Sequence, residues 1–332
     1  MSEPDEPMHD IAHLGQVELL TPEPSESLRF FRDILGMQVA HRRNGSVWLR
    51  GFGDHAAATL KLTEAPDAGV GTIAWRTTSP AALERRAAAL TEAGLGEGWT
   101  NGDFGRGRSF RCHDPEGHRF ELYYEEQRHV ACEATRSRLK NLPSRYPAQG
   151  VGVRRIDHLA LLCRDVAANR GFAQALLGMR LREQVIYDDG ATEIGSWLSP
   201  SPVHHQLAYV LDAKGGHARL HHFALWVDER ADVLRAADLL SEAGVFIEAG
   251  PAKHNNSQGF YLYGYEPGGN RIEIYSGSYL VFAPDFEVVR WNEKERAGGV
   301  HWGGALPESF MTYATPDLPL ATARAHAPID PR

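Results

Sequence analysis

The sequence has few cysteines, no long apolar run and no excess of basic residues, and each of these absences excludes a class of protein. Its three cysteines, Cys112, Cys132 and Cys163, are odd in number and lack CxxC spacing, so they predict neither a disulfide framework nor a zinc cluster. No apolar run is long enough for a transmembrane helix, and the acidic opening MSEPDEPMHD lacks the hydrophobic segment of a secretion signal. We therefore expect a cytoplasmic protein.

The balance of charge excludes nucleic acid as an expected partner. The formal net charge is −8, whereas binding to a phosphate backbone requires concentrated Lys and Arg. The 332 residues, 42% of them hydrophobic and 23% charged, are typical of a globular chain with about two domains. The chain also lacks a GxSxG motif, so a serine hydrolase of that type is not indicated.

The chain contains one structural plan twice. The paired segments are 15–39 with 157–181, 72–95 with 223–246, and 114–125 with 266–277. The first two pairs have the pattern of a short strand followed by an amphipathic helix, and the third is a hairpin closed by a turn that contains Pro and Gly. Each copy therefore contains two strand–helix–strands units. This alternation predicts an α+β fold with its helices on one outer face and a site on the concave inner face.

The repeat divides the chain into five predicted parts. They are a flexible N-terminus (1–10), a first copy (11–126), a linker (127–153), a second copy (154–277) and a C-terminal extension (278–332). The linker is polar and has Pro and Gly near its end. We expect the extension to fold over the second copy and its last residues to be disordered.

Comparison of the copies singles out His158, His222 and Glu273, each on a predicted strand of the second copy. The corresponding positions of the first copy are Gln16, Gly71 and Glu121. Two histidines and one carboxylate form the facial triad of non-haem iron sites, which leaves coordination positions open. The competing interpretation is that they are ordinary strand residues, and it applies best to Glu273, because the first copy keeps a Glu there. Strand alternation predicts that His221 points away from the site.

The residues around this triad resemble the type I extradiol ring-cleaving dioxygenases (catechol 2,3-dioxygenase type) of the vicinal oxygen chelate superfamily. The signature of that family is matched by His254, Leu262-Tyr263, Glu266-Pro267, Gly269 and Glu273. With IDHLALL, RLHHFALW and the repeat, the resemblance covers about residues 11 to 305. It implies two tandem vicinal-oxygen-chelate domains, each built of two βαβββ modules.

The resemblance also implies a site and a reaction. An Fe(II) ion, less often Mn(II), is expected on His158, His222 and Glu273 of the C-terminal copy, with the N-terminal copy metal-free. The other implied site residues are the acid–base histidine His205, with its neighbour His204 pointing elsewhere, the substrate-binding His254 and Tyr263, and the pocket wall Trp197. The implied reaction inserts O2 into the ring bond beside the hydroxyls of a catechol, which yields a muconic semialdehyde in aromatic-compound degradation. The family also implies a homo-oligomer.

Some positions depart from the family pattern. Ala252 and Asn255 flank His254 where other residues are usual. Ala249 and Gly299 stand where members that take carboxylated catechols have arginine, so an uncharged catechol is expected, with Lys253 and Arg296 as the other available cations. The alternative functions are a metal-dependent glyoxalase or isomerase, and a ligand-sequestering resistance protein of the same fold.

Overall fold

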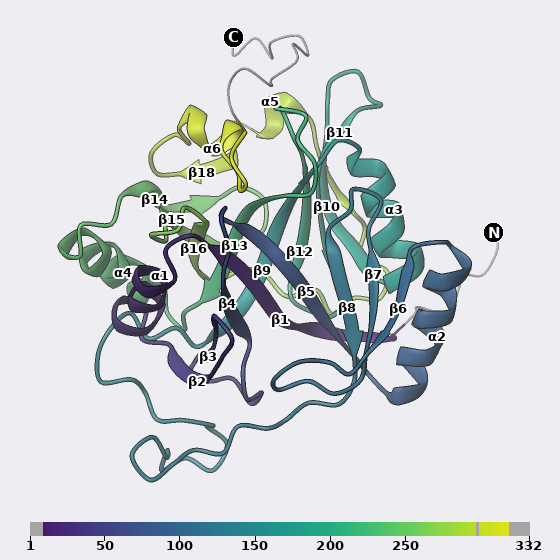
Figure 1. Cartoon of the computed structure of the whole chain (residues 1–332). Coiled ribbons are helices and arrows are strands. Elements are labelled where there is room, and N and C mark those ends of the chain that lie inside the picture. The colour runs from purple at the N-terminus through teal and green to yellow at the C-terminus, as the bar shows by residue number, and fades with distance from the viewer. Residues whose placement is uncertain (1–8, 297–298, 319–332) are drawn as a thin grey trace.

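The computed structural model describes residues 9–296 and 299–318, with the side chain of Arg296 excepted. Most of the predicted flexible N-terminus (1–8) and the end of the extension (319–332) lie outside these residues. Two mixed sheets form the centre of the molecule, and the longer helices lie at its periphery (Figure 1). Among the described helices, none combines the length and the apolar character that a membrane span requires.

The first sheet is built from two βαβββ modules. Its elements are β1 (Ile11–Thr21), α1 (Pro24–Arg29) with the π-helical turn η1 (Phe30–Ile34), β2 (Gln38–Arg43), β3 (Ser46–Arg50), β4 (Leu60–Glu64), β5 (Gly69–Thr77), α2 (Pro80–Glu92), β6 (Gly96–Thr100), β7 (Ser109–His113) and β8 (Arg119–Tyr123). The strand order is β2-β3-β4-β1-β5-β8-β7-β6. The first strand of each module pairs in parallel with its last strand, and β1 and β5 join the modules antiparallel.

The second sheet repeats this plan. Its elements are β9 (Arg155–Cys163), α3 (Val166–Leu177), β10 (Arg180–Ile186), β11 (Glu193–Ser199), β12 (Leu207–Leu211), β13 (Arg219–Trp226), α4 (Arg230–Glu242), β14 (Ile247–His254), β15 (Phe260–Tyr265) and β16 (Arg271–Ser276). The strand order is β17-β10-β11-β12-β9-β13-β16-β15-β14-β18. Without the two outermost strands it is the order of the first sheet, so the α+β class and the βαβββ modules are confirmed.

The C-terminal extension supplies those two outermost strands. It contains β17 (Val289–Trp291), α5 (Glu293–Arg296), β18 (Val300–Trp302) and α6 (Glu308–Thr312). β17 pairs with β10 at one edge, and β18 pairs with β14 at the other. The described part of the extension is therefore integrated into the second sheet and covers the edges formed by β10 and β14.

Helix ends follow local sequence signals. Ser79 caps α2 by accepting a hydrogen bond from the backbone of Ala82, with Pro80 at the first helical position. Asp165 caps α3 in the same way. Gly178 ends α3 in the left-handed conformation, at a φ of 67°, which glycine adopts without steric cost.

Sheet register corrects one pairing of the two copies. In each copy the carboxylate lies opposite an alanine of the strand that precedes the second helix: Glu121 with Ala74, and Glu273 with Ala224. The counterpart of His222 is therefore Thr72, not Gly71. Similar helix sequences allow a slip of one residue in a sequence pairing, whereas the hydrogen-bonded ladder allows only one register.

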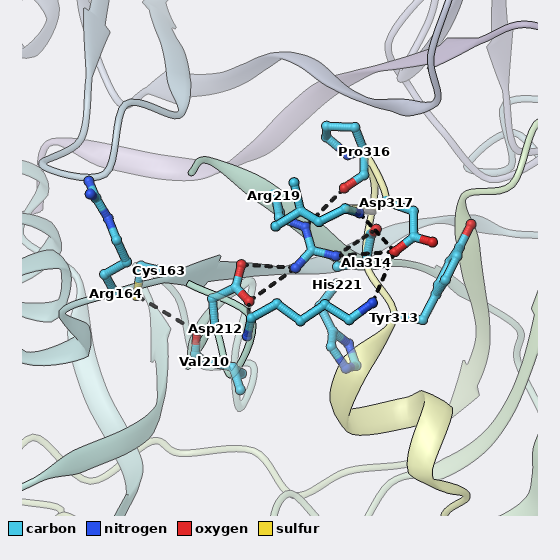
Figure 2. A network of polar contacts seen from close by, with 12 residues as sticks. Cys163, Arg164, Val210, Asp212, Arg219, His221, Tyr313, Ala314, Pro316 and Asp317 are labelled. Carbon is cyan, nitrogen blue, oxygen red and sulfur yellow. Dashed lines mark hydrogen bonds and ion pairs between the residues drawn. The ribbon is translucent and has the colours of Figure 1, made fainter. Parts of the chain in front are cut away.

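The end of the described chain is anchored to the second sheet by a buried arginine (Figure 2). The guanidinium of Arg219 donates to both carboxylate oxygens of Asp212, at 3.0 Å each. It also donates to the backbone carbonyls of Ala314 at 3.0 Å and Pro316 at 2.9 Å. These bonds hold α6, which directly precedes this segment, against the sheet.

Candidate metal centre and catalytic pocket

Three side chains from three neighbouring strands converge in the second sheet. His158 lies on β9, His222 on β13 and Glu273 on β16, and all three are buried. The two Nε2 atoms are 3.2 Å apart, and Oε2 of Glu273 lies 2.9 Å from Nε2 of His158 and 3.4 Å from Nε2 of His222. Because β9, β13 and β16 are adjacent, one side chain from each reaches a single point above the sheet.

This donor set fits a divalent cation. The Oε2 atom of Glu273 is fully buried and accepts no hydrogen bond among the described residues, although two imidazole nitrogens lie within 3.4 Å. A buried carboxylate oxygen that accepts no hydrogen bond is costly, and either a proton on Nε2 of His158 or a metal ion between the three atoms would neutralise it. Two imidazoles and one carboxylate, with open positions toward a cavity, are typical of non-haem iron or manganese.

The electrostatics of the site favour a positive charge at the point of convergence. Burial opposes a charge on His158, but the carboxylates of Glu273 and Asp157 outweigh it and raise its pKa to about 9. Burial, together with the nearby His158 and Arg271, lowers the pKa of His222 to about 3. Burial also opposes a charge on Glu273, yet the surrounding histidines hold its pKa far below the usual range. A metal cation can replace the proton that His158 holds.

Outer partners direct both imidazoles toward this point. Nδ1 of His158 lies 2.8 Å from Oδ2 of Asp157, so a proton on Nδ1 is donated to the carboxylate and the lone pair of Nε2 faces inward. His222 reaches the same state through His221. Nε2 of His221 donates to the carbonyl of Phe310 at 2.7 Å, which leaves its Nδ1 as the acceptor for Nδ1–H of His222, also at 2.7 Å.

The contact between the adjacent histidines corrects the expectation that His221 points away from the site. The pairing of β13 with β9 shifts register between Leu220 and His222 and again between Phe223 and Leu225. Such irregularities break the strict alternation of a strand. His221 therefore contacts the ring of His222 and lines the same cavity.

A cavity of about 370 Å³ opens over the three residues. Trp197 on β11 forms part of its wall, and Gly195 leaves room for the indole, since a Cβ there would lie 2.9 Å from the ring. His254, at the end of β14, lies with its Nε2 3.1 Å from Oη of Tyr263 on β15. Its Nδ1 lies 3.2 Å from the carbonyl of Gly299. All the side chains expected in the site line this one cavity.

His205 lies in the loop between β11 and β12 and lines the same cavity. Its ring centroid is 4.0 Å from that of His158. Its Nδ1 lies 2.8 Å from Nδ1 of His204. Nε2 of His204 in turn lies 2.8 Å from Oε1 of Glu183. His204 does not belong to the lining of this cavity, but its ring contacts that of His205.

The first copy has a fixed cation at the equivalent place. Arg106 donates to Gln16 at 3.1 Å and forms a short ion pair with Glu121. These two residues are the counterparts of His158 and Glu273. Both charged side chains of the pair are almost fully buried. A permanent guanidinium charge therefore neutralises Glu121, which explains why the carboxylate occurs in a copy without the histidines.

Sequence reasoning did not identify four neighbours of the site, namely Asp157, His221, His204 and Glu183. Two of them belong to the doublets His204-His205 and His221-His222, whose rings contact each other in a loop and at an irregular part of β13 respectively. Asp157 directly precedes a predicted ligand. Glu183 carries no local signal, because it reaches the site from β10 by tertiary folding.

Comparison with known proteins follows the same division of the chain. A family model described as the Glyoxalase/Bleomycin resistance protein/Dioxygenase superfamily matches residues 12–122 and again residues 155–274. One match falls on each sheet, and together they cover more than half of the chain. The chain belongs to this superfamily, and the predicted pair of vicinal-oxygen-chelate domains is confirmed.

Individual relatives narrow the family. The metapyrocatechase of Geobacillus stearothermophilus is 41% identical over 314 residues, or 94% of this chain and 95% of the relative. The manganese-dependent 2,3-dihydroxybiphenyl 1,2-dioxygenase of Geobacillus genomosp. 3 is 38% identical over 299 residues, or 89% and 94%. The crystal structure of homoprotocatechuate 2,3-dioxygenase from Arthrobacter globiformis matches with a TM-score of 0.83 and 28% identity, covering 96% of each chain. Within the superfamily, the chain is one of the extradiol ring-cleaving dioxygenases, as predicted.

Proposed function

We propose that the protein cleaves an uncharged catechol with O2 next to its hydroxyl groups, using a metal ion held by His158, His222 and Glu273. The observation that carries the proposal is the convergence of these side chains around a buried carboxylate oxygen that accepts no hydrogen bond among the described residues, beneath a cavity. Bound there, Fe(II) or Mn(II) supplies a Lewis acid that lowers the pKa of the catechol hydroxyls and an electron source for O2. A 1:1 reaction places both oxygen atoms in the product, a muconic semialdehyde.

His254 and Tyr263 orient the substrate. Nδ1 of His254 lies 3.2 Å from the carbonyl of Gly299, and its Nε2 lies 3.1 Å from the hydroxyl of Tyr263 and 3.4 Å from Oε1 of Glu273. Burial raises the pKa of Tyr263 well above its usual value, with the Glu273 carboxylate adding to the effect. The phenol therefore stays protonated at neutral pH and donates a hydrogen bond. Nε2 of His254 and the hydroxyl of Tyr263 lie 3.1 Å apart at the cavity, so both can hydrogen-bond the same catechol oxygen.

His205 is the proton-transfer group of the proposal. It borders the cavity beside His158, and histidine is suited to accepting a proton near neutral pH and returning it later. Burial holds the pKa of His205 well below its usual value, so the ring is neutral before substrate arrives and can act as a base. A catechol that binds through its oxygens must release a proton, and His205 is in place to receive it.

The wall of the cavity supports an uncharged substrate. The apolar side chains that face the cavity include Val185, Ile194, Trp197, Leu306 and Met311. No Arg or Lys belongs to its lining among the described residues; the side chain of Arg296, one of the two cations considered from the sequence, lies outside them. A buried carboxylate without a cationic partner is unfavourable. Alkyl- and aryl-substituted catechols are therefore the substrate class that the pocket fits.

The test is simultaneous measurement of O2 uptake and absorbance with metal-loaded protein and alkyl-, aryl- and carboxyl-substituted catechols. We expect one O2 consumed per yellow ring-opened product, with the carboxylated catechols slowest. Parallel loading with Fe(II) and Mn(II) decides the metal, which one relative's name gives as manganese. No uptake at full occupancy of either metal would refute the proposal and favour a glyoxalase-type isomerisation. A homo-oligomer, implied by the family, is tested by sedimentation of the same preparation.

A further inference from the structure

We infer that Glu183 and His204 form a hydrogen-bonded relay that fixes the tautomer of His205, so that its Nε2 is a bare proton acceptor facing the cavity. Oε1 of Glu183 lies 2.8 Å from Nε2 of His204, and Nδ1 of His204 lies 2.8 Å from Nδ1 of His205. All three side chains are buried. The inference rests on the proposed function only in giving His205 the role of base.

Glu183 is held as a carboxylate by its other contacts. The indole Nε1 of Trp291 donates to Oε2 at 2.6 Å, and the backbone amide of Ser257 donates to Oε1 at 3.0 Å. Neither group can accept a hydrogen bond. The hydroxyl of Tyr279 adds a third bond at 2.7 Å. Burial opposes the charge, but the interactions with His204, Tyr279 and Ser257 outweigh it and lower the pKa of Glu183.

The direction of each hydrogen bond in the relay then follows from the carboxylate of Glu183. A carboxylate only accepts, so His204 carries its proton on Nε2. Burial lowers the pKa of His204 despite the adjacent Glu183, so the ring is neutral and its Nδ1 is a lone pair. A contact of 2.8 Å between two Nδ1 atoms requires one proton between them. That proton belongs to His205, whose Nε2 is left without one.

The unprotonated Nε2 of His205 can act as a base only in the cavity. Among the described residues it makes no hydrogen bond at Nε2, and the ring borders the cavity next to His158. A tautomer with the proton on Nε2 would present a donor instead of a base. Glu183 and His204 are therefore positioning residues for proton transfer, as the outer partner of an imidazole fixes which nitrogen is available. Through Ser257 and Trp291, Glu183 also ties the relay to the loop after His254 and to the C-terminal extension.

The experiment compares His204→Phe with His204→Gln in the metal-loaded enzyme. Phe keeps a ring of similar size but accepts no hydrogen bond, so the proton of His205 can move to Nε2. We expect kcat to fall by about 10- to 100-fold, the usual cost of losing an outer partner of a histidine, with unchanged metal content and little change in KM. Gln offers an amide oxygen to His205 and an amide N–H to Glu183, so it should restore much of kcat.

A second readout reports the tautomer without catalysis. Ring ¹⁵N NMR of histidine-labelled protein loaded with diamagnetic Zn(II) distinguishes a protonated from a bare nitrogen, and His205→Phe identifies the signals of His205. Wild type should show a protonated Nδ1 and a bare Nε2, and His204→Phe should lose this state. Tyr279→Phe, which removes one bond to Glu183 but leaves the contact between the histidines, should affect kcat less.

The outcomes separate the relay from the proposed function. Unchanged kcat in His204→Phe, an equal loss in Tyr279→Phe, or a bare Nδ1 of His205 in wild type would each overturn the relay. If the wild-type enzyme takes up no O2 with any catechol, the proposed function fails, and the nitrogen spectra alone decide whether the relay exists.

Discussion

Replacement of His221 by Phe tests how the metal centre is held. His222 must keep its proton on Nδ1 to offer Nε2 to a metal, and that proton is donated to His221 across 2.7 Å. In the metal-free variant His222 can move the proton to Nε2 and donate it to Glu273, which lies 3.4 Å away. In the metal-bound variant Nε2 of His222 binds the metal, so the proton cannot move there and stays on Nδ1. The cost of the unsatisfied, buried N–H therefore falls on the metal-bound state alone.

The expected size of the effect follows from two independent magnitudes. An unsatisfied buried donor costs about 1–3 kcal/mol. Loss of an outer partner weakens metal binding about 10- to 100-fold, which is about 1.4–2.7 kcal/mol at 1.36 kcal/mol per factor of ten. The two ranges agree. His222→Ala removes a ligand altogether and should abolish retention of the metal.

Competition with a chelator of known affinity measures the dissociation constant of each variant. His55→Ala, at an exposed position in the first copy, is the control for loss of a histidine as such. If His221→Phe and His222→Ala lost metal equally, His221 would itself be a ligand and the assignment of roles would be wrong. An unchanged dissociation constant in His221→Phe would show that the contact between the histidines does not support the site.

Three further predictions concern the first copy, the extension and the pocket. Arg106→Met leaves Glu121 with only an exposed arginine as partner and should lower the free energy of unfolding in denaturant by about 3 kcal/mol; adding Glu121→Met should recover most of it, and failure to recover would contradict a role for charge. Arg219→Met leaves Asp212 unpaired and frees the carbonyls that follow α6, so protease cleavage near the C-terminus and KM should both rise; unchanged cleavage would show that the arginine is not the anchor. Trp197→Ala should lower kcat/KM for catechol by about tenfold or more, with a smaller loss for aryl-substituted catechols, because apolar pocket contacts are worth about 1–3 kcal/mol; equal losses across the series would remove Trp197 from the wall.

The sequence alone was sufficient for the fold class and for the residues that converge in the second sheet. The two copies are visible because strand alternation, helical periodicity and turn residues are local patterns that recur along the chain. His158, His222 and Glu273 stand out because the same fold exists in the first copy with other residues at two of the three positions. The signature around His254 and Tyr263 identified the family, which the relatives confirm.

Several features depended on contacts between distant parts of the chain. The register of β13 against β9 and β16 showed that the counterpart of His222 in the first copy is Thr72 and not Gly71. The irregularity of the same strand brought His221 to the ring of His222. The guanidinium of Arg106 reaches the counterpart site from a loop with no metal-binding pattern. The extension, which the sequence predicted to fold over the second copy, supplies edge strands to the second sheet.

The composition and periodicity of the sequence thus determined which elements form, how often they repeat and which residue types are available for a metal and a catechol. Tertiary structure alone decided which atoms of those residues face the cavity. The physical reason is that elements arise from interactions within a few residues, whereas the protonated nitrogen of a histidine is set by its hydrogen-bond partner. For His205 that partner is His204, which is in turn bonded to Glu183. Glu183 lies on another strand, and only the folded sheet brings it near.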